Sequence, residues 1–414
     1  MKNDRIYSYV LSSILIIILY AYIFAPPFKF LPIGLDKVVL IWSILYLFSK
    51  SKGKNLLHQF QTELIFCGII CLYCFFVTVI HSFSSLMFLS YDLVFTLELM
   101  IVPYALTDFF YKKYHLDINK NALYICIIAG AISLFLLLNP DIATLLKTEY
   151  FKYPEIAQKN FPWRGFGISD GLLFSYPIVE GFAIGLIIIG GVGTYKNKWI
   201  YYSGCLLMLC AIIPNARSGF IPIITAIIIL SLLRPGRVVK ISIIVAVFVS
   251  IFSALLIDFI DKNEALNKTY EWSLTFFDIF SSLLSGEKVE NAEALLDTMI
   301  IFPQSIDEWL IGSGRILSTE SDGSDIGYIV RLNFGGIVYI FIIIVFLLYL
   351  FSKLKRIDYK VAILWIITAL YANYKGDFLI NTPLSRFLML YYVYIILLRN
   401  KYNHYNPTFS ETNS

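Results

Sequence analysis

The sequence predicts an all-α, polytopic integral membrane protein that forms a single membrane domain over residues 1–414. Of the 414 residues, 58% are hydrophobic and only 15% are charged, a composition unlike that of soluble globular domains. Apolar runs of about 17–25 residues recur along the chain, and a helix of this length crosses a bilayer. About twelve spans are predicted, in chain order 6–25, 31–48, 63–81, 87–110, 121–138, 171–192, 199–213, 219–233, 241–257, 326–350, 361–374 and 386–398.

The distribution of lysine and arginine predicts the orientation of these spans. With the N-terminus inside, the internal segments hold nineteen such residues, whereas the short external turns hold only Lys29, Arg217, Lys375 and Arg386. Cytoplasmic loops of membrane proteins carry the excess of basic residues. We therefore expect both termini in the cytoplasm. The net charge of +4 reflects this bias and gives no reason to expect nucleic-acid binding.

Two extramembrane segments are long, and both are predicted to be external: about 139–170 and about 258–325. Loops of this length are usually functional or disordered. The second holds fourteen of the 29 acidic residues, so it can bind sugar hydroxyls and supply a catalytic base, or it can be a solvated acidic cap. Its segments 271–280 and 289–297 have apolar residues at helical spacing, which predicts short amphipathic helices on the outer surface.

Several ionisable residues lie inside the predicted spans or at their outer ends. Burying a charge in a span costs about 3 kcal/mol or more, so such residues are expected to face a polar cavity or one another. They are Asp36, Asp92, Glu98, Glu180, Arg217, Arg331, Asp377 and Arg386.

Three external arginines lie next to glycines. They are Arg164 in Trp163-Arg164-Gly165-Phe166-Gly167, Arg217 in Asn215-Ala216-Arg217-Ser218-Gly219, and Arg315 in Gly312-Ser313-Gly314-Arg315. Glycine lets the backbone approach a ligand closely, and the planar guanidinium donates two parallel hydrogen bonds to phosphate. The pattern indicates an anionic ligand at the outer face.

The order of these elements resembles that of the O-antigen and capsular polysaccharide polymerases (Wzy type) and the related O-antigen ligases. The resemblance covers most of the chain in layout, through short motifs. They are Arg164-Gly165, Arg217-Ser218-Gly219, Gly312-Ser313-Gly314 with Asp325-Ile326-Gly327-Tyr328, Gly335-Gly336, and the segment from Lys375-Gly376-Asp377 to Arg386.

The resemblance implies a GT-C-like membrane glycosyltransferase in the bacterial inner membrane, which acts in lipopolysaccharide or capsule biosynthesis. Such an enzyme moves a growing glycan from undecaprenyl diphosphate to another undecaprenyl-diphosphate-linked oligosaccharide at the outer face. Membrane lipid, a chain-length regulator and a flippase are the expected partners. Neither a metal nor another cofactor is expected, because arginines can neutralise the diphosphate.

Within that resemblance, we expect the leaving diphosphate to be bound by Arg164 and Arg217, assisted by Arg315 and Arg331. Preorganised cations lower the barrier because negative charge grows on the diphosphate as the glycosidic bond breaks. Asp325 is the expected general base, and Arg217 the expected catalytic cation. The secondary candidates are Lys375, Asp377 and Arg386.

Two alternatives remain. The O-antigen ligases carry a histidine in the large periplasmic loop, whereas here His58, His115 and His404 are predicted to be cytoplasmic and His81 ends the third span. This favours a polymerase over a ligase-like transferase. A flippase or transporter of lipid-linked sugars would place its charges near mid-bilayer and often has repeated halves. Neither feature is evident.

Overall fold

The computed structural model shows a helical protein. The model describes residues 2–49, 52–81, 86–152, 167–170, 175–190, 198–236, 267, 299–317, 323–324, 326–376 and 382–405. Within these ranges every named element is a helix, and the only extended pairing is an isolated bridge between Phe28 and Phe151. The predicted all-α fold is therefore confirmed.

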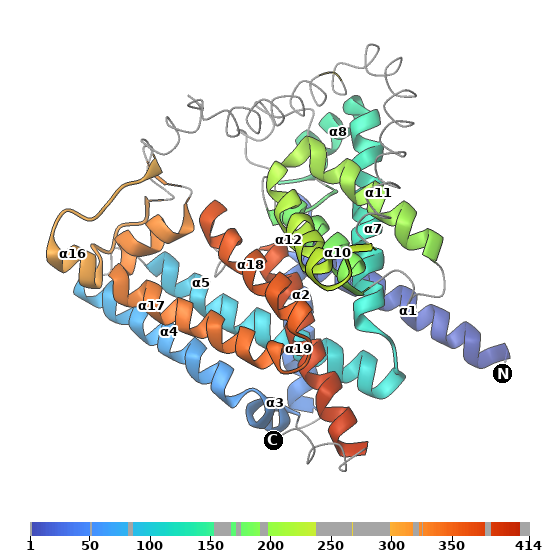
Figure 1. Ribbon diagram of the computed structural model, residues 1–414, viewed down its shortest axis with the longest axis horizontal. Helices are drawn as coiled ribbons and strands as arrows, with labels where there is room; N and C mark the ends of the chain where they lie inside the picture. Colours follow the sequence, from blue (N-terminus) through green and yellow to red (C-terminus); the bar gives the residue numbers. More distant parts are fainter. Residues whose placement is uncertain are drawn as a thin grey trace. The chain divides into compact units, whose positions relative to one another are not determined.

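The chain divides into two compact units. Unit 1 comprises residues 1–23, 35–123 and 299–414, and unit 2 comprises residues 24–34 and 124–298. The helices of unit 1 are α1 (Lys2–Ile23), α2 (Leu35–Ser49), α3 (Gly53–Gln59), α4 (Gln61–Ile80), α5 (Leu86–Thr96), η1 (Leu97–Ile101), α6 (Val102–Leu106), η2 (Thr107–Lys113), α16 (Ile306–Ile311), α17 (Gly327–Lys355), α18 (Tyr359–Lys375) and α19 (Pro383–Tyr405). Those of unit 2 are α8 (Pro140–Leu145), η3 (Leu146–Tyr150), α10 (Ser175–Gly190), α11 (Lys198–Asn215), η5 (Arg217–Gly219) and α12 (Phe220–Leu233), and α7 (Ile118–Leu138) runs from unit 1 into unit 2 (Figure 1).

Four helices are long and apolar enough to cross a membrane, which suggests a membrane protein. They are Gln61–Ile80, Phe88–Lys113, Ile118–Leu138 and Gly327–Lys355. Shorter apolar helices are Ser8–Ile23, Ser175–Gly190, Trp199–Asn215 and Phe220–Leu233. Twelve spans and cytoplasmic termini stay predictions. The predicted span 241–257 and the amphipathic segments 271–280 and 289–297 lie outside the described residues, and the predicted loop 139–170 begins with helix α8 and the π-helical turn η3.

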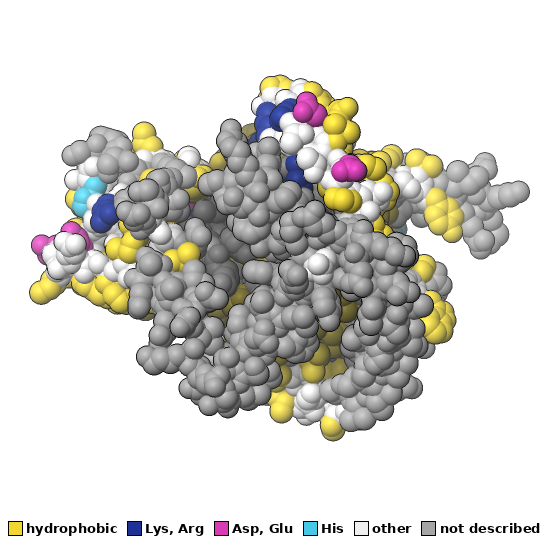
Figure 2. All heavy atoms as spheres, turned by 90° about the horizontal axis from the view of Figure 1, so that it is seen from above, with side chains coloured by type: hydrophobic (Ala, Val, Ile, Leu, Met, Phe, Trp, Pro, Cys, Tyr) yellow, Lys and Arg dark blue, Asp and Glu magenta, His cyan; other side chains and the backbone are white. Residues whose placement is uncertain are grey.

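The surface of α4 has the pattern of a helix that faces lipid on one side. Cys67 and Cys74 are buried, whereas Leu72 and Phe76 on the opposite side are exposed by 69% and 50%. In the view of Figure 2, hydrophobic side chains likewise make up much of the described surface, and the charged side chains form a few small groups. Large exposed apolar areas are rare on soluble monomers, so they indicate contact with lipid or another protein.

Helices α4 and α17 run antiparallel along their length (Figure 1). At one end Lys353 forms an ion pair with Glu63. Farther along, the rings of Tyr73 and Tyr339 stack with centroids 5.6 Å apart. Residues near the start of α4 thus contact the end of α17, and residues near the end of α4 contact the first half of α17.

Helix α17 is broken at Gly336, whose φ of 70° and ψ of −172° are not helical. Only glycine adopts this conformation readily. A Cβ at Gly336 would also lie 2.3 Å from the carbonyl oxygen of Leu310. The break frees backbone carbonyls of the preceding turn, and the hydroxyl of Tyr73 donates to one of them, that of Gly335, at 2.7 Å.

The segment 312–315, which we call the glycine strap, satisfies two more of these carbonyls. The backbone N–H of Ser313 donates to the carbonyl of Asn333 at 2.8 Å, and that of Gly314 donates to the carbonyl of Phe334 at 3.1 Å. Unsatisfied buried carbonyls are costly. The break in α17 is therefore stabilised by a segment that precedes the helix in the chain.

In unit 2, helix α10 is buried along nearly its whole length and packs against α11 and α12 (Figure 1). Its sequence alternates bulky apolar residues with the small residues Gly181, Ala183 and Gly185. Small residues let helices of membrane proteins approach closely, so α10 forms the centre of the described part of this unit.

Candidate functional site

The first turns of α10 are contacted by both of the predicted arginine–glycine segments of unit 2. Gly167, which follows Arg164 by three residues, packs on Tyr176: a Cβ at Gly167 would lie 2.5 Å from its hydroxyl oxygen. A Cβ at Gly219, in the same η5 turn as Arg217, would lie 2.5 Å from the carbonyl oxygen of Pro177. Successive residues of one helix therefore contact two segments that are far apart in the chain.

Glycine is required on α10 itself for this packing. A Cβ at Gly181 would lie 1.9 Å from the carbonyl oxygen of Gly219, so no larger residue fits unless the η5 turn moves. Tyr176 is fixed in turn, because its hydroxyl donates to the carbonyl of Ala129 on α7 at 3.0 Å. The position of the Arg217 backbone is thus set by close backbone contact with a helix that is itself fixed.

Polar side chains accompany the η5 turn. The side chain of Asn215 donates to Ser133 at 3.4 Å and to the carbonyl of Ala211 at 2.6 Å. Ser218 is buried, and its hydroxyl has no hydrogen-bond partner among the described residues. A buried polar group without a partner is costly, so Ser218 is a candidate to contact a ligand at this turn.

Gly181→Ala is expected to destabilise the protein, because the added methyl group overlaps backbone that cannot rotate away. Overpacking of this kind costs about 1–3 kcal/mol of unfolding free energy, measured as a lower unfolding temperature in detergent. Gly68→Ala on α4 is the matched control, since no heavy atom lies within 4 Å of its Cβ position. That change is expected to leave the stability equal or to raise it, since alanine favours a helix. Equal stability of the two variants would contradict the proposed packing.

The predicted site residues fall into three groups. Arg164, Asp325 and Asp377 lie outside the described residues, and for Arg217 and Lys375 the structure describes the backbone only. Arg315 is an exposed residue of the glycine strap in unit 1. Arg331 and Arg386 are buried, each with only 1% of its surface exposed, and each forms an ion pair.

Arg331 is held by groups from two helices of unit 1. Its guanidinium donates to Asp92 of α5 at 3.2 Å and also to the hydroxyl of Tyr339, which itself donates to the other Asp92 oxygen. The guanidinium carbon lies 4.4 Å from the centre of the Phe88 ring. A cation over an aromatic face and beside a carboxylate is stabilised in a buried setting. The charge of Arg331 is therefore balanced by Asp92.

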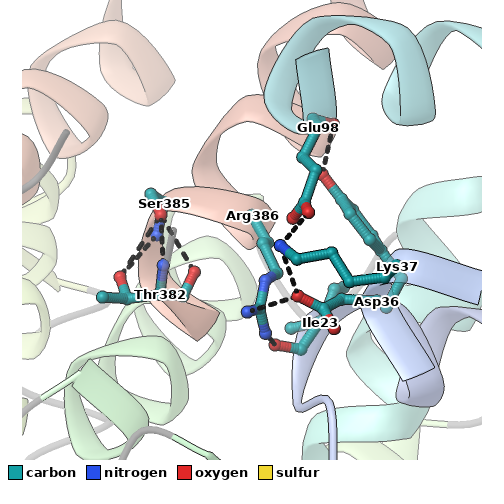
Figure 3. A network of polar contacts seen from close by, with 8 residues as sticks. Ile23, Asp36, Lys37, Glu98, Thr382, Ser385 and Arg386 are labelled. Atoms are coloured by element: carbon teal, nitrogen blue, oxygen red, sulfur yellow. Dashed lines mark hydrogen bonds and ion pairs between the residues drawn. The ribbon is translucent and has the colours of Figure 1, made fainter. Parts of the chain in front are cut away.

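Arg386 belongs to a second buried network of unit 1 (Figure 3). It donates to Asp36 at 3.2 Å and to the carbonyl of Ile23 at 3.1 Å. Lys37 forms ion pairs with both Asp36 and Glu98. In Figure 3 the two cations and the two carboxylates point toward one another from α19, α2 and η1. Two positive and two negative charges meet here, so this network is a balanced link between helices.

Five of the eight ionisable residues predicted inside the spans or at their outer ends therefore face charged partners in these two networks: Asp36, Asp92, Glu98, Arg331 and Arg386. Glu180 belongs to neither network, and the side chains of Arg217 and Asp377 are not described. The aromatic partners Tyr339 and Phe88 were not anticipated, because an aromatic residue in an apolar run carries no signal of its own. His81 was also assigned no role. A Cβ at Gly314 of the glycine strap would lie 2.7 Å from the His81 ring, whose buried Nε2 has no hydrogen-bond partner in the described ranges.

No group of three or more His, Cys, Asp or Glu side chains in the described residues is placed to hold a metal ion. Each unit contains basic side chains, backbone amides and hydroxyl groups, and these are the kinds of group that bind anions in proteins. Comparison of the sequence with protein-family models finds none that matches, and comparison with curated proteins finds no match.

Proposed function

We propose that this chain is a polymerase of lipid-linked oligosaccharide repeat units, acting at the outer face of a bacterial inner membrane. The observation that supports this most directly is the packing of Gly167 and Gly219 on Tyr176 and Pro177 of α10. It joins the segment that follows Arg164 to the turn that carries Arg217. In this proposal the guanidinium groups of Arg164 and Arg217 bind the two phosphoryl groups of one diphosphate.

The proposed reaction is glycosyl transfer with a diphosphate leaving group. The acceptor hydroxyl attacks the anomeric carbon of the growing chain, the bond to the diphosphate oxygen breaks, and undecaprenyl diphosphate leaves. Arg164 and Arg217 stabilise the charge that develops on the leaving oxygen. Asp325, which is proposed from the sequence alone, takes the proton of the acceptor hydroxyl, and Arg315, which is proposed on the same ground, assists in binding the diphosphate. Arg331 and Arg386, whose charges are balanced by carboxylates, serve in this proposal to hold helices together.

The test is the state of the lipid-linked glycan in a strain that lacks this protein. We expect single repeat units on undecaprenyl diphosphate to accumulate at the outer face, and re-expression to restore the ladder of longer chains. A further strain expresses the Arg217→Ala variant at the same membrane level as the natural protein, and we expect its lipid-linked glycan to resemble that of the deletion strain. An unchanged ladder in the deletion strain would overturn the proposal.

A ligase-like transferase is the second candidate, and the position of His81 favours it. Although this histidine belongs to the end of α4, it packs against Gly314, within the segment 258–325. A histidine that is not part of the large predicted loop therefore contacts a residue of that loop. If the chain is a ligase, its deletion leaves long lipid-linked chains untransferred, and His81→Gln abolishes transfer. If it is a polymerase, His81→Gln leaves the ladder of chain lengths intact.

A further inference from the structure

The segment before the glycine strap exposes apolar side chains on one face. Phe302, Ile306, Trp309 and Leu310 are exposed by 56%, 78%, 39% and 48%, and the rings of Phe302 and Trp309 stack with centroids 5.7 Å apart. At about 100° per residue Ile306, Trp309 and Leu310 lie within about 100° of one another around α16, and Phe302, which precedes the helix, joins them through its stacking on Trp309. We call them the α16 apolar face.

The opposite side of α16 is polar and well satisfied. Glu308 lies about 160° around the helix from both Ile306 and Leu310, and it accepts a hydrogen bond from the backbone of Gln304 at 2.8 Å. The Ser305 hydroxyl caps the helix by accepting from the backbone of Glu308 at 3.2 Å. An acidic first turn and a serine cap stabilise a short helix at its N-terminus. The helix is therefore amphipathic and well formed, although it is too short to cross a bilayer.

Contacts with α17 place α16 at the end of a membrane-spanning segment. The backbone of Leu310 packs against Gly336, where α17 is broken. From Gly336 to Lys355 the helix rises about 30 Å at 1.5 Å per residue, which is the thickness of the hydrocarbon core. Ile337 and Phe341, which follow the break directly, are exposed by 51% and 65%. The apolar surface of the span thus begins where α16 touches it.

The end of α4 independently indicates that α16 lies at the end of a membrane-spanning segment. Helix α4 is also long enough to cross the bilayer, and it runs antiparallel to α17. His81, the residue after its last turn, packs on Gly314 of the glycine strap. Two spans therefore end beside the segment that contains α16 and the strap.

We infer that the α16 apolar face binds a lipid surface: it lies in the interfacial layer of the membrane, beside the ends of α4 and α17. Its aromatic and aliphatic side chains are those that enter this layer. Its continuity with the exposed apolar surface of α17 favours lipid as the occupant over a second protein. The consequence for Arg315 is that it is held at the level of the lipid headgroups. The inference does not depend on the proposed polymerase activity.

The test compares labels on the two sides of α16. In full-length protein with its six cysteines replaced, single cysteines at Ile306 and at Glu308 carry a nitroxide, and the protein is reconstituted in phosphatidylcholine vesicles. We expect the label at Ile306 to collide preferentially with oxygen, which dissolves in lipid. The label at Glu308 is expected to collide with a water-soluble nickel complex. Equal accessibility of both labels to nickel, or shielding of the Ile306 label from both reagents, would overturn the inference.

A second measurement needs no cysteine replacement. Quenching of tryptophan fluorescence by brominated phosphatidylcholine is measured for the natural chain and for Trp309→Phe, and the difference isolates Trp309. We expect bromines placed near the headgroups to quench Trp309 more strongly than bromines near the bilayer centre. The absence of any lipid-dependent difference between the two proteins would count against the inference.

Discussion

Replacing Arg217 by lysine is expected to reduce polymer formation about a hundredfold or more, the usual effect of removing one preorganised donor from a developing charge. Lysine keeps the charge but donates from a single point, so it cannot form the two parallel hydrogen bonds of a guanidinium. Since the η5 turn is fixed on α10 by Gly181 and Gly219, the backbone cannot shift to compensate. The measurement is the ladder of lipid-linked chain lengths in cells that contain equal amounts of each variant.

Arg356→Lys is the matched control for this prediction. Arg356 is an exposed arginine that follows the last turn of α17, and its replacement is expected to leave the ladder unchanged. Chains of normal length from Arg217→Lys at normal membrane levels would rule out a bidentate role for Arg217. A loss of activity in both variants would instead point to a general requirement for arginine in membrane insertion.

Asp92→Ala is expected to destabilise the protein by about 3–5 kcal/mol, because it leaves a buried guanidinium without its carboxylate. Both side chains of the pair are almost completely buried, with 2% and 1% of their surfaces exposed, so water cannot replace the lost partner. The measurement is the unfolding temperature in detergent, together with the amount of protein that reaches the membrane.

Two further variants separate the ion pair from other effects of the substitution. Asp141→Ala removes an exposed acidic residue from the first turn of α8, and it is expected to change stability by about 0.5 kcal/mol or less. Asp92→Leu combined with Arg331→Met removes both charges and is expected to recover most of the stability. If the double variant is as unstable as Asp92→Ala, the loss arises from packing and not from an unpaired charge.

The helical architecture was predictable, because its signal is local. An apolar run of bilayer length indicates a helix without any knowledge of its neighbours, as for Gln61–Ile80. The break in α17 was not predictable in this way. The sequence Gly335-Gly336 does not by itself predict a break, because its conformation depends on hydrogen bonds from the strap and from Tyr73. A helix break of this kind depends on contacts between segments that are distant in the chain, and the hydrophobic pattern of the sequence does not predict those contacts.

The same distinction holds for the candidate site. That charged residues inside spans should pair follows from the cost of burying them. Which residues pair does not follow, since Asp92 and Arg331 are 239 positions apart in the chain. Likewise, the sequence places His81 at the end of a span but does not predict that it is a neighbour of the large loop, because its contact with Gly314 exists only once α4 and the strap have packed together.

The hydrogen bonds between the glycine strap and α17 have a consequence for the order in which the protein is made. Residues 312–315 leave the ribosome before residues 333–336, yet the N–H groups of Ser313 and Gly314 complete the carbonyl pairing of the later segment. Lipid offers no hydrogen-bond donors. A segment that is made earlier thus completes the backbone pairing of a later one, so α17 can adopt its break only where the strap is already within reach.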